Sequence, residues 1–204
     1  MKKYDKYKDS GVEWIGSIPY HWKLKPLKFL LKKGKDGIRI GPFGSSLKSD
    51  IIQRSGLKVY GQENVINDDF TLGYRYINKD KFDELSEYEI ESGDVLITMM
   101  GTTGKSKIVP LDIKRGIMDS HLIRMRFDDV KILPVLISFL INESYYIYNQ
   151  VKYLSKGSIM EGLNSATVKS FLIAVPPIDE QGRIVDFIIN KIGNILKAIE
   201  RKNN

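Results

Sequence analysis

One glycine-rich stretch, GDVLITMMGTTGKS at residues 93–106, ends like a phosphate-binding loop, because an apolar run leads into Gly104, Lys105 and Ser106. The loop of an ATPase also needs a glycine five residues before Gly104, where this chain has Met99. It must open a helix as well, whereas the following residues continue as a β-type run that a proline interrupts. The spacing therefore argues against a nucleotidase. It predicts a hairpin between strands, whose glycines let the backbone approach nucleic-acid phosphate.

A second set of residues that could do chemistry is Asp94 with Asp112 and Lys114, which loosely imitates the acids and lysine around Mg²⁺ in a nuclease. Asp112 falls in a predicted turn, and so short a pattern arises easily by chance. His21 and His121 are far apart in the sequence and there are no cysteines, so we expect no metal site. We predict no catalytic residues, with an Mg-dependent DNA endonuclease as the alternative.

The chain is basic, with a net charge of +7 and an isoelectric point near 9.3. The excess is concentrated in residues 23–39, where lysines and one arginine accompany a single acid. Such a surface favours a polyanionic partner, nucleic acid above all. No apolar run resembles a signal peptide or reaches the length of about 18 residues that a membrane span needs, so we expect a soluble, cytoplasmic protein.

The elements that must position these residues are mostly short strands. Alternating or apolar runs bounded by turn residues predict strands near residues 57–65, 95–100, 122–127 and 171–175. Within residues 1–178 a helical period is clear only over residues 132–154, and a short helix is expected after Pro26. The pattern predicts an α+β fold, with one globular domain of mixed strands and a few helices over residues 1–178.

The C-terminal residues 179–204 predict a long helix of coiled-coil type, with Asp179 as its N-cap. Its aliphatic residues follow the alternating spacing of a heptad seam, and further isoleucines broaden that seam. Such a helix needs a partner, and the alternative is that it folds back on its own domain. The residues predicted to mediate dimerisation are Val185, Ile188, Ile189, Ile192, Ile195, Leu196 and Ile199.

Two end segments carry a likeness to a known family. GVEWIGSIPYHWKLKPLKFL near the N-terminus and IAVPPIDEQGRIVDFI near the C-terminus resemble the specificity (S) subunits of type I restriction-modification systems. Between them GPFGSSLKS, YGQENV, GDVLITMMGTTGK and SKGSIMEGLN match the family's recognition domain in order. Full S subunits hold two recognition domains and two spacer helices. This sequence has one of each, as in a half-subunit or a fragment.

The resemblance implies a non-catalytic subunit that binds double-stranded DNA and binds no cofactor itself. Its expected partners are methylation subunits that use S-adenosylmethionine and a restriction and translocation subunit that uses ATP and Mg²⁺. Two copies packed antiparallel through the terminal helix would imitate the two-domain member, so we predict a homodimer that reads a bipartite, inverted-repeat site. An interaction adaptor, whose helix recruits a partner without base reading, is a further alternative.

The resemblance also makes the polar loops candidates for DNA contact, because amides and hydroxyls match base edges and lysines match phosphates. Gln62 and Asn64 are the sharpest candidates, since an amide can form two hydrogen bonds to adenine. Alternatively, they cap the turn after Gly61. The predicted DNA-contacting residues are Arg39, Ser45, Ser46, Lys48, Arg54, Gln62, Asn64, Thr102, Thr103, Lys105, Lys107, Ser120, Lys156 and Ser158.

Overall fold

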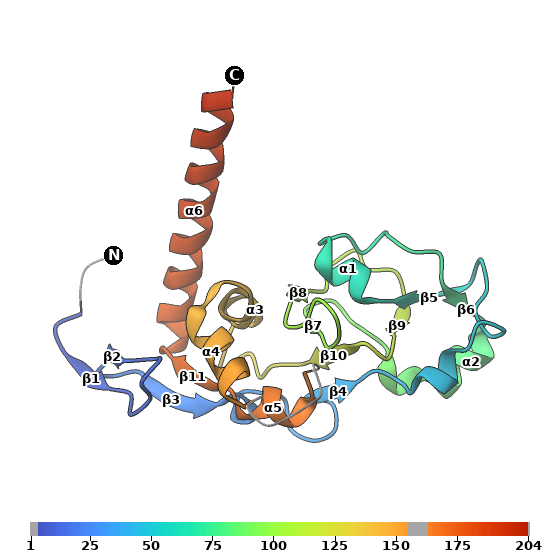
Figure 1. Cartoon of the computed structure of the whole chain (residues 1–204), viewed down its shortest axis with the longest axis horizontal. Coiled ribbons are helices and arrows are strands. Elements are labelled where there is room, and N and C mark those ends of the chain that lie inside the picture. The colour runs from blue at the N-terminus through green and yellow to red at the C-terminus, as the bar shows by residue number, and fades with distance from the viewer. Residues whose placement is uncertain (1–3, 155–162, 204) are drawn as a thin grey trace.

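The computed structural model describes residues 4–154 and 163–203 (Figure 1). The strands are β1 Tyr7–Asp9, β2 Ser17–Pro19, β3 Lys23–Pro26, β4 Ile38–Ile40, β5 Leu57–Tyr60, β6 Tyr76–Ile77, β7 Val95–Thr98, β8 Ser106–Ile108, β9 Gly116–Met118, β10 Leu122–Met125 and β11 Leu172–Val175. The α-helices are α1 Gln62–Ile66, α2 Lys79–Glu84, α3 Pro134–Glu143, α4 Tyr145–Leu154, α5 Ser165–Ser170 and α6 Ile178–Asn203. Short 3₁₀ turns are η1 Leu27–Phe29, η2 Gly44–Leu47 and η3 Ser86–Tyr88.

Two sheets form the centre of the body. One has the strand order β4-β10-β7-β8 with antiparallel neighbours, and the other has the order β6-β5-β9, in which β5 and β9 run parallel. Two further pairs, β1 with β2 and β3 with β11, lie toward the N-terminal end of the body (Figure 1). This mixture of short strands and helices confirms the predicted α+β class.

The main core lies between the four-stranded sheet and the helical elements that cover it. Leu27 and Leu30 around η1, Ile97 and Ile123 in the sheet, and Phe171 after α5 are all fully buried in this cluster. Two smaller clusters fill the space around β5 and β9. Burial of one such side chain stabilises the folded state by about 1.5–3 kcal/mol. These clusters therefore fix the positions of the strand ends and of the loops that follow them.

Strand β10 departs from the simple alternation of its sequence. The pattern of HLIRMRF suggests that its arginines face solvent, but Arg124 is only 1% exposed. Burial lowers the pKa of Arg124, as does the neighbouring Arg126, while the charge of Asp94 acts against both effects. Asp94 is itself 3% exposed and accepts hydrogen bonds at 2.8 and 3.2 Å from Arg126. Arg124 on the strand, Arg126 directly after it and Asp94 directly before β7 therefore form a largely buried charged cluster.

Several local predictions need correction. The helical run over residues 132–154 is two helices, because Ser144 adopts an extended ψ of 124° and separates α3 from α4. The helices α1 and α2 were not predicted, since their segments are too short for a helical period to be visible. The expected helix after Pro26 is a single 3₁₀ turn. The N-terminal segment, for which no strand was predicted, contains the β1–β2 hairpin.

The N-terminal segment clamps the start of α6. The Glu180 carboxylate accepts a hydrogen bond from the Tyr4 hydroxyl, pairs with His21 Nε2 at 2.8 Å and accepts one from Trp22 Nε1 at 3.1 Å. Asp179 is not the N-cap: the helix begins at Ile178, and the carbonyl before it accepts from the N–H groups of Glu180 and the next residue. The two end segments that resemble the S subunits therefore meet in the fold.

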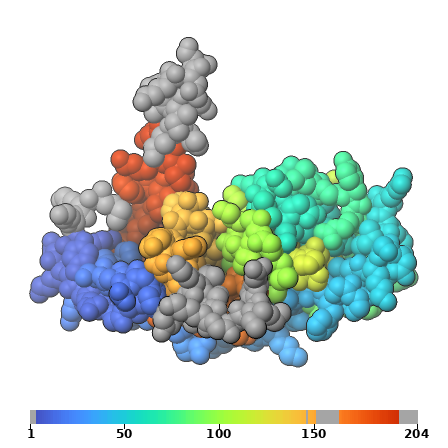
Figure 2. Space-filling view, in the orientation of Figure 1, coloured from blue at the N-terminus to red at the C-terminus, as the bar shows by residue number. Residues whose placement is uncertain are grey.

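Gln181 completes this clamp from the other side of the helix. Its side chain is fully buried, accepts a hydrogen bond from the Leu133 N–H at 2.9 Å and donates to the carbonyls of Lys131 and Pro176 at 3.0 Å. Farther along, Ile184 and Val185 pack against the main core. Beyond this point α6 stands out from the body (Figure 2). The direction in which α6 leaves is thus fixed by hydrogen bonds to three separate parts of the chain.

Replacing Glu180 with glutamine is expected to lower the free energy of unfolding at pH 7 by about 1–3 kcal/mol, because the donors around it lose a charged acceptor. Burial raises the pKa of Glu180, but the hydrogen bonds from Tyr4, His21 and Trp22 outweigh it, so the folded pKa lies below its usual 4.5. Stability from this carboxylate is therefore present above about pH 4.5 and is lost as the pH falls through the folded pKa.

Urea unfolding at pH 7 and at pH 3 measures this effect, with Asp179→Asn, on the exposed side of the same helical turn, as the control. The difference between Glu180→Gln and the parent chain should shrink at the lower pH. Equal stability of the two proteins at pH 7 would contradict the clamp.

Candidate nucleic-acid interface

The ends of five strands converge at one place in the structure. The pairing registers put Ile40 beside Ile123, Thr98 beside Leu122, and Tyr60 beside Met118. The chain segments that follow β4, β5 and β7, and the turn from β9 into β10, therefore all leave the two sheets at a common edge. We call Gly41, Gly61–Gln62, Met99–Lys105 and Asp119–His121 the loop edge.

Backbone hydrogen bonds tie these segments to one another. The N–H of Met99 donates to the His121 carbonyl at 2.9 Å, and the N–H of Asp119 donates to the Tyr60 carbonyl at 2.8 Å. Side chains add a further link, because Gln62 Oε1 accepts from the Met100 N–H at 3.1 Å. The loop edge is thus a connected surface rather than a set of independent loops.

One glycine is required for this close approach. A Cβ atom on Gly41 would lie 1.7 Å from the backbone carbonyl oxygen of Asp119, so this position has no room for a side chain. A Cβ atom on Gly61 would lie 2.2 Å from the Arg75 guanidinium, but that group is the end of a flexible side chain and can move. The first glycine of GPFGSS therefore serves the packing of the loop edge.

The glycine-rich hairpin between β7 and β8 is confirmed. Lys105 N–H donates to the Thr98 hydroxyl at 3.0 Å, and the Thr103 hydroxyl donates to the Met99 carbonyl at 3.3 Å, so the turn is held by its own polar groups. The residues after the turn form a strand and no helix follows, in agreement with the argument against a nucleotidase. Thr102 and Lys105 are exposed at the tip.

A charged network that we did not predict lies beneath the loop edge. Arg75 is bonded to Asp119 at 2.8 Å and to Glu63 at 3.3 Å, and its side chain is 37% exposed. Asp119 is almost buried and also accepts from the backbone N–H of His121 at 2.9 Å. His121 itself is exposed. The local signal in the sequence was that Asp119, Ser120 and His121 directly precede the strand predicted at residues 122–127.

Asn64 requires a correction, because it does not face the surface. It is fully buried, accepts a hydrogen bond from the Gly61 N–H and donates to the carbonyls of Asp69 and Leu72, each at 2.9 Å. These bonds use the whole amide, so the capping alternative holds for this residue. Gln62 is half-buried at the loop edge, and its Nε2 makes no hydrogen bond to another described residue.

Three basic candidates lie away from the loop edge or are already paired. Arg39 contacts Glu87 at 2.5 Å, and Lys107 contacts Asp68 at 2.7 Å. Arg54 precedes β5, whereas the loop edge begins at the other end of that strand. These three were predicted from residue type alone, and the structure does not bring them together with Gln62.

The other candidates divide between two places. Ser120 belongs to the loop edge, together with Thr102, Thr103 and Lys105. Ser45, Ser46 and Lys48 lie on or directly after η2, a few residues beyond Gly41, beside Phe43, which is 84% exposed. Lys156 and Ser158 lie outside the described residues. No residue in the described ranges has been tested against DNA, so the DNA contacts stay predictions.

The aliphatic residues of α6 do not all have the same surroundings. Val185 packs against the protein's own core, so the alternative of folding back holds for the first turns of the helix. Ile188 is half-buried, Ile189 is 58% exposed and Ile192 is 43% exposed. The side chains of Ile195, Leu196 and Ile199 lie outside the described residues. An unpaired apolar face therefore begins about three turns into the helix.

The nuclease alternative concerns Asp94, Asp112 and Lys114. In residues 4–154 and 163–203, no group of three or more histidines, cysteines and acids could hold a metal ion. Asp94, one of the two acids of this alternative, is bonded to Arg126. In the same part of the chain, no helix is long and apolar enough to cross a membrane.

Comparisons with known proteins identify the family of this chain. The family model described as the type I restriction modification DNA specificity domain matches residues 36–204. A curated relative, the putative type I restriction enzyme MjaX specificity subunit of Methanocaldococcus jannaschii, is 25% identical over an alignment of 196 positions that covers 93% of this chain and 44% of that protein.

Solved structures show the same fold. The HsdS subunit from Thermoanaerobacter tengcongensis has a TM-score of 0.59 at 18% identity, covering 97% of this chain and 43% of that one. A chain from a structure of type I R-M complex assembly and conformational transition has a TM-score of 0.60 at 17% identity, covering 96% and 43%. This chain thus spans less than half the length of these relatives. Because the family model covers all but the first 35 residues, the chain belongs to the family of type I restriction-modification DNA specificity domains.

Proposed function

We propose that this protein is a DNA-recognition subunit that reads one half of a bipartite target for a type I restriction-modification enzyme. The observation that carries the proposal is the loop edge, where amide, hydroxyl and ammonium groups from three chain segments meet on one surface. A duplex presents base edges and phosphates within a few ångströms of each other, so it requires such a mixture of groups. The family to which the chain belongs supports the same function.

The proposed roles follow from side-chain chemistry. Gln62 and the exposed Thr102 offer groups that match base edges, while Lys105 offers a charge that matches phosphate without regard to sequence. Arg75 can donate to a guanine with the hydrogens that its bonds to Asp119 and Glu63 leave unused. The buried carboxylate of Asp119 holds this guanidinium in position, so its orientation is set before DNA arrives.

We further propose that the protein acts as a homodimer through the exposed part of α6, in complex with methylation and restriction subunits. The chain provides no chemistry of its own in this proposal. Methyl transfer from S-adenosylmethionine, and cleavage that uses ATP and Mg²⁺, belong to the partner subunits. The exposed Ile189 and Ile192 support the dimer, because a helix that stands out from its body needs a partner for such a face.

Replacing Gln62 with alanine should relax the preference for one base by about 1–3 kcal/mol and leave stability nearly unchanged. Replacing Asn64 with alanine should do the reverse. It leaves the Gly61 N–H and two carbonyls without their partner, and lowers the free energy of unfolding by about 1–3 kcal/mol.

Selection from a pool of random duplexes, with urea unfolding of the same preparations, separates these two effects. An unchanged preferred sequence in the Gln62→Ala protein would remove Gln62 from base reading. A protein that selects no sequence at all, although it binds DNA, would contradict the proposed function.

A further inference from the structure

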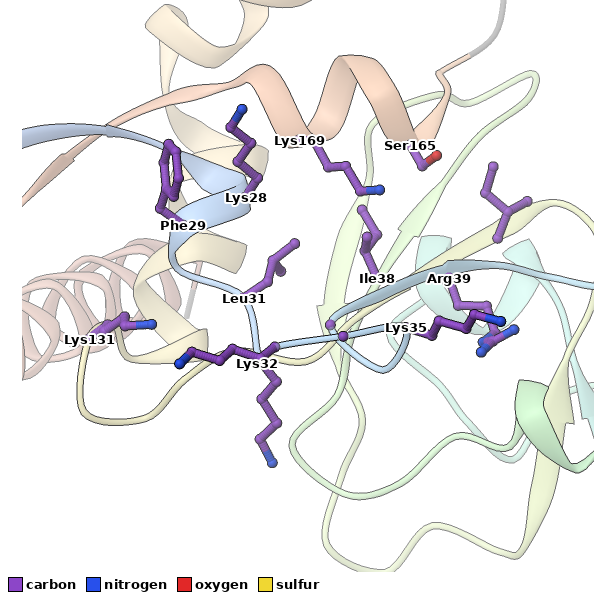
Figure 3. A pocket seen from close by; sticks show the side chains of 14 residues that line it. Lys28, Phe29, Leu31, Lys32, Lys35, Ile38, Arg39, Lys131, Ser165 and Lys169 are labelled. Carbon is purple, nitrogen blue, oxygen red and sulfur yellow. The ribbon is translucent and has the colours of Figure 1, made fainter.

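A second basic surface lies apart from the loop edge. It is a groove of about 750 Å³ between η1, the loop that follows η1, strand β4, and helix α5. Figure 3 shows Lys28 of η1, Lys32 and Lys35 of the loop, Lys169 of α5, and Lys131 from the segment before α3 around the groove. We call it the lysine groove, after its cationic side chains: Lys28, Lys32, Lys33, Lys35, Arg39, Lys131 and Lys169.

The charge of the lysine groove is largely uncompensated. Among the residues that the structure describes, no aspartate or glutamate lines it. Arg39 is paired with Glu87 and Lys131 with Asp128, but the other five cations form no ion pair within the described residues. The one acid of residues 23–39, Asp36, lies toward Arg124 and Arg126, at 3.6 and 3.5 Å. Repulsion among unpaired ammonium groups costs free energy, which an anionic ligand would relieve.

The loop that carries three of these lysines is firmly held. Arg126 fixes both of its ends, since the Lys32 N–H donates to the Arg126 carbonyl and the Arg126 N–H donates to the Gly37 carbonyl, each at 2.9 Å. A Cβ atom on Gly37 would lie 2.2 Å from the Lys32 carbonyl oxygen, so the loop folds tightly on itself. The ammonium groups therefore project from a fixed base, and not from a loose tail.

The residue composition of the lysine groove favours a nucleic acid over a protein as its partner. Lysine is depleted in the cores of protein interfaces, where aromatic residues and arginine dominate. Six of the seven cations here are lysines, which act as point charges on flexible stems and bind phosphate without reading bases. A row of exposed lysines without acids is the arrangement that tracks a phosphodiester backbone.

The position of the groove relates it to the loop edge. The groove includes β4, and the loop edge starts at Gly41, directly after that strand. A strand of three residues is about 10 Å long, while one turn of duplex is about 34 Å. A single duplex is therefore long enough to contact both surfaces.

We propose that the lysine groove binds the phosphate backbone of duplex DNA beside the bases that the loop edge reads, and that it does so without sequence preference. The location of this DNA rests on the proposed function, whereas the affinity of the groove for a duplex does not. The groove would hold the protein on any DNA and add affinity to the target complex.

The test compares the full-length parent with the triple variant Lys32→Gln, Lys33→Gln, Lys35→Gln. A control, Lys6→Gln, Lys23→Gln, Lys114→Gln, removes the same charge from exposed lysines outside the groove. Fluorescence anisotropy measures binding of each protein to a random-sequence duplex pool across a salt series. Thermal melting confirms that all three proteins are folded.

We expect the groove variant to bind the pool more weakly and its salt slope to flatten by up to about 2.7 units, or about 0.9 per lost contact. The fall in affinity between 50 and 200 mM salt would then be about 40-fold smaller than in the parent. The control should keep the parent's slope, and both variants should still select the parent's preferred sequence.

A groove variant whose slope equals that of the control overturns the inference and leaves the groove to an acidic protein partner. Changed sequence selection by the groove variant also overturns it, because the groove would then read bases. If no protein selects a sequence, the proposed function fails, yet the loss of slope in the groove variant would still establish the backbone contact.

Discussion

Replacing Ile189 and Ile192 with aspartate is expected to convert the protein from a dimer to a folded monomer. Both side chains are exposed on α6, and burial of each in a second copy would stabilise the pair by up to about 1.5–3 kcal/mol. Aspartates would place four like charges in the interface of a symmetric dimer, where they lack counter-ions. The exposed positions do not pack on the protein's own body, so its fold should persist.

The effect on DNA binding should be large. A dimer holds two half-sites at once, and the second contact forms at high effective concentration, so its loss lowers affinity by about 10²–10⁴-fold. Light scattering and binding to a duplex with both half-sites measure the two outcomes. The control Asn190→Asp, Asn194→Asp adds the same charge to the opposite face of the helix. A monomeric parent at tens of micromolar would contradict the dimer.

The symmetry of the pair determines the form of the target. A two-fold dimer presents the same loop edge twice in inverted orientation, so its site is an inverted repeat. Helix α6 spans 26 residues, or about 39 Å at 1.5 Å per residue. This is close to one turn of duplex, about 34–36 Å. A methylated motif without inverted symmetry would indicate pairing with a different half-subunit.

Replacing Asp94 with alanine is expected to lower the free energy of unfolding by about 3–5 kcal/mol. The change removes the buried acceptor of Arg126 and the counter-charge that lies 3.9 Å from Arg124, and breaking a buried ion pair leaves an uncompensated charge. Burial and the charge of Arg126 already lower the pKa of Arg124, and without the opposing charge of Asp94 this pKa would fall further. Urea unfolding measures the loss.

The matched control for this prediction is Asp112→Ala. Asp112 is exposed, so its removal should change stability little. The same pair of variants tests the nuclease alternative. If Asp94 and Asp112 held Mg²⁺, both variants would lose DNA cleavage that the parent shows with Mg²⁺, and Asp94→Ala would not be selectively unstable. Parent protein that leaves plasmid intact removes this alternative altogether.

Some strands and turns were predictable because they depend on local residue types. The β7–β8 hairpin follows from its glycines, and β11 from an apolar run that two prolines end. The convergence of Gly41, Gln62 and His121 was not predictable, because it depends on pairing between strands that are far apart in the sequence. Side-chain polarity also gave wrong predictions of exposure. Asn64 and Arg124 are polar residues of the kind expected at the surface, yet they are among the most buried polar groups.

The candidate site shows the same limit. Thr102 and Lys105 were identified from a turn whose tip must be exposed. Arg39 and Lys107 were identified from charge alone, and each meets an acid from a distant segment. A single sequence does not reveal such pairings, since the residues around Glu87 and Asp68 do not indicate which distant basic residue each acid contacts.

Strand β3, near the start of the chain, pairs with β11, the last strand before α6. Residues 27–171 lie between these strands, so the whole loop edge is carried on a segment that starts and finishes at one fixed frame. The clamp around Glu180 joins α6 to the residues directly before β3, and Gln181 joins α6 to the residues before α3; neither set belongs to the loop edge. If the loop edge reads bases and α6 pairs two copies, as we propose, sequence changes in the loops would alter the target and leave the pairing unchanged. Such a molecule could evolve new targets without evolving a new partner.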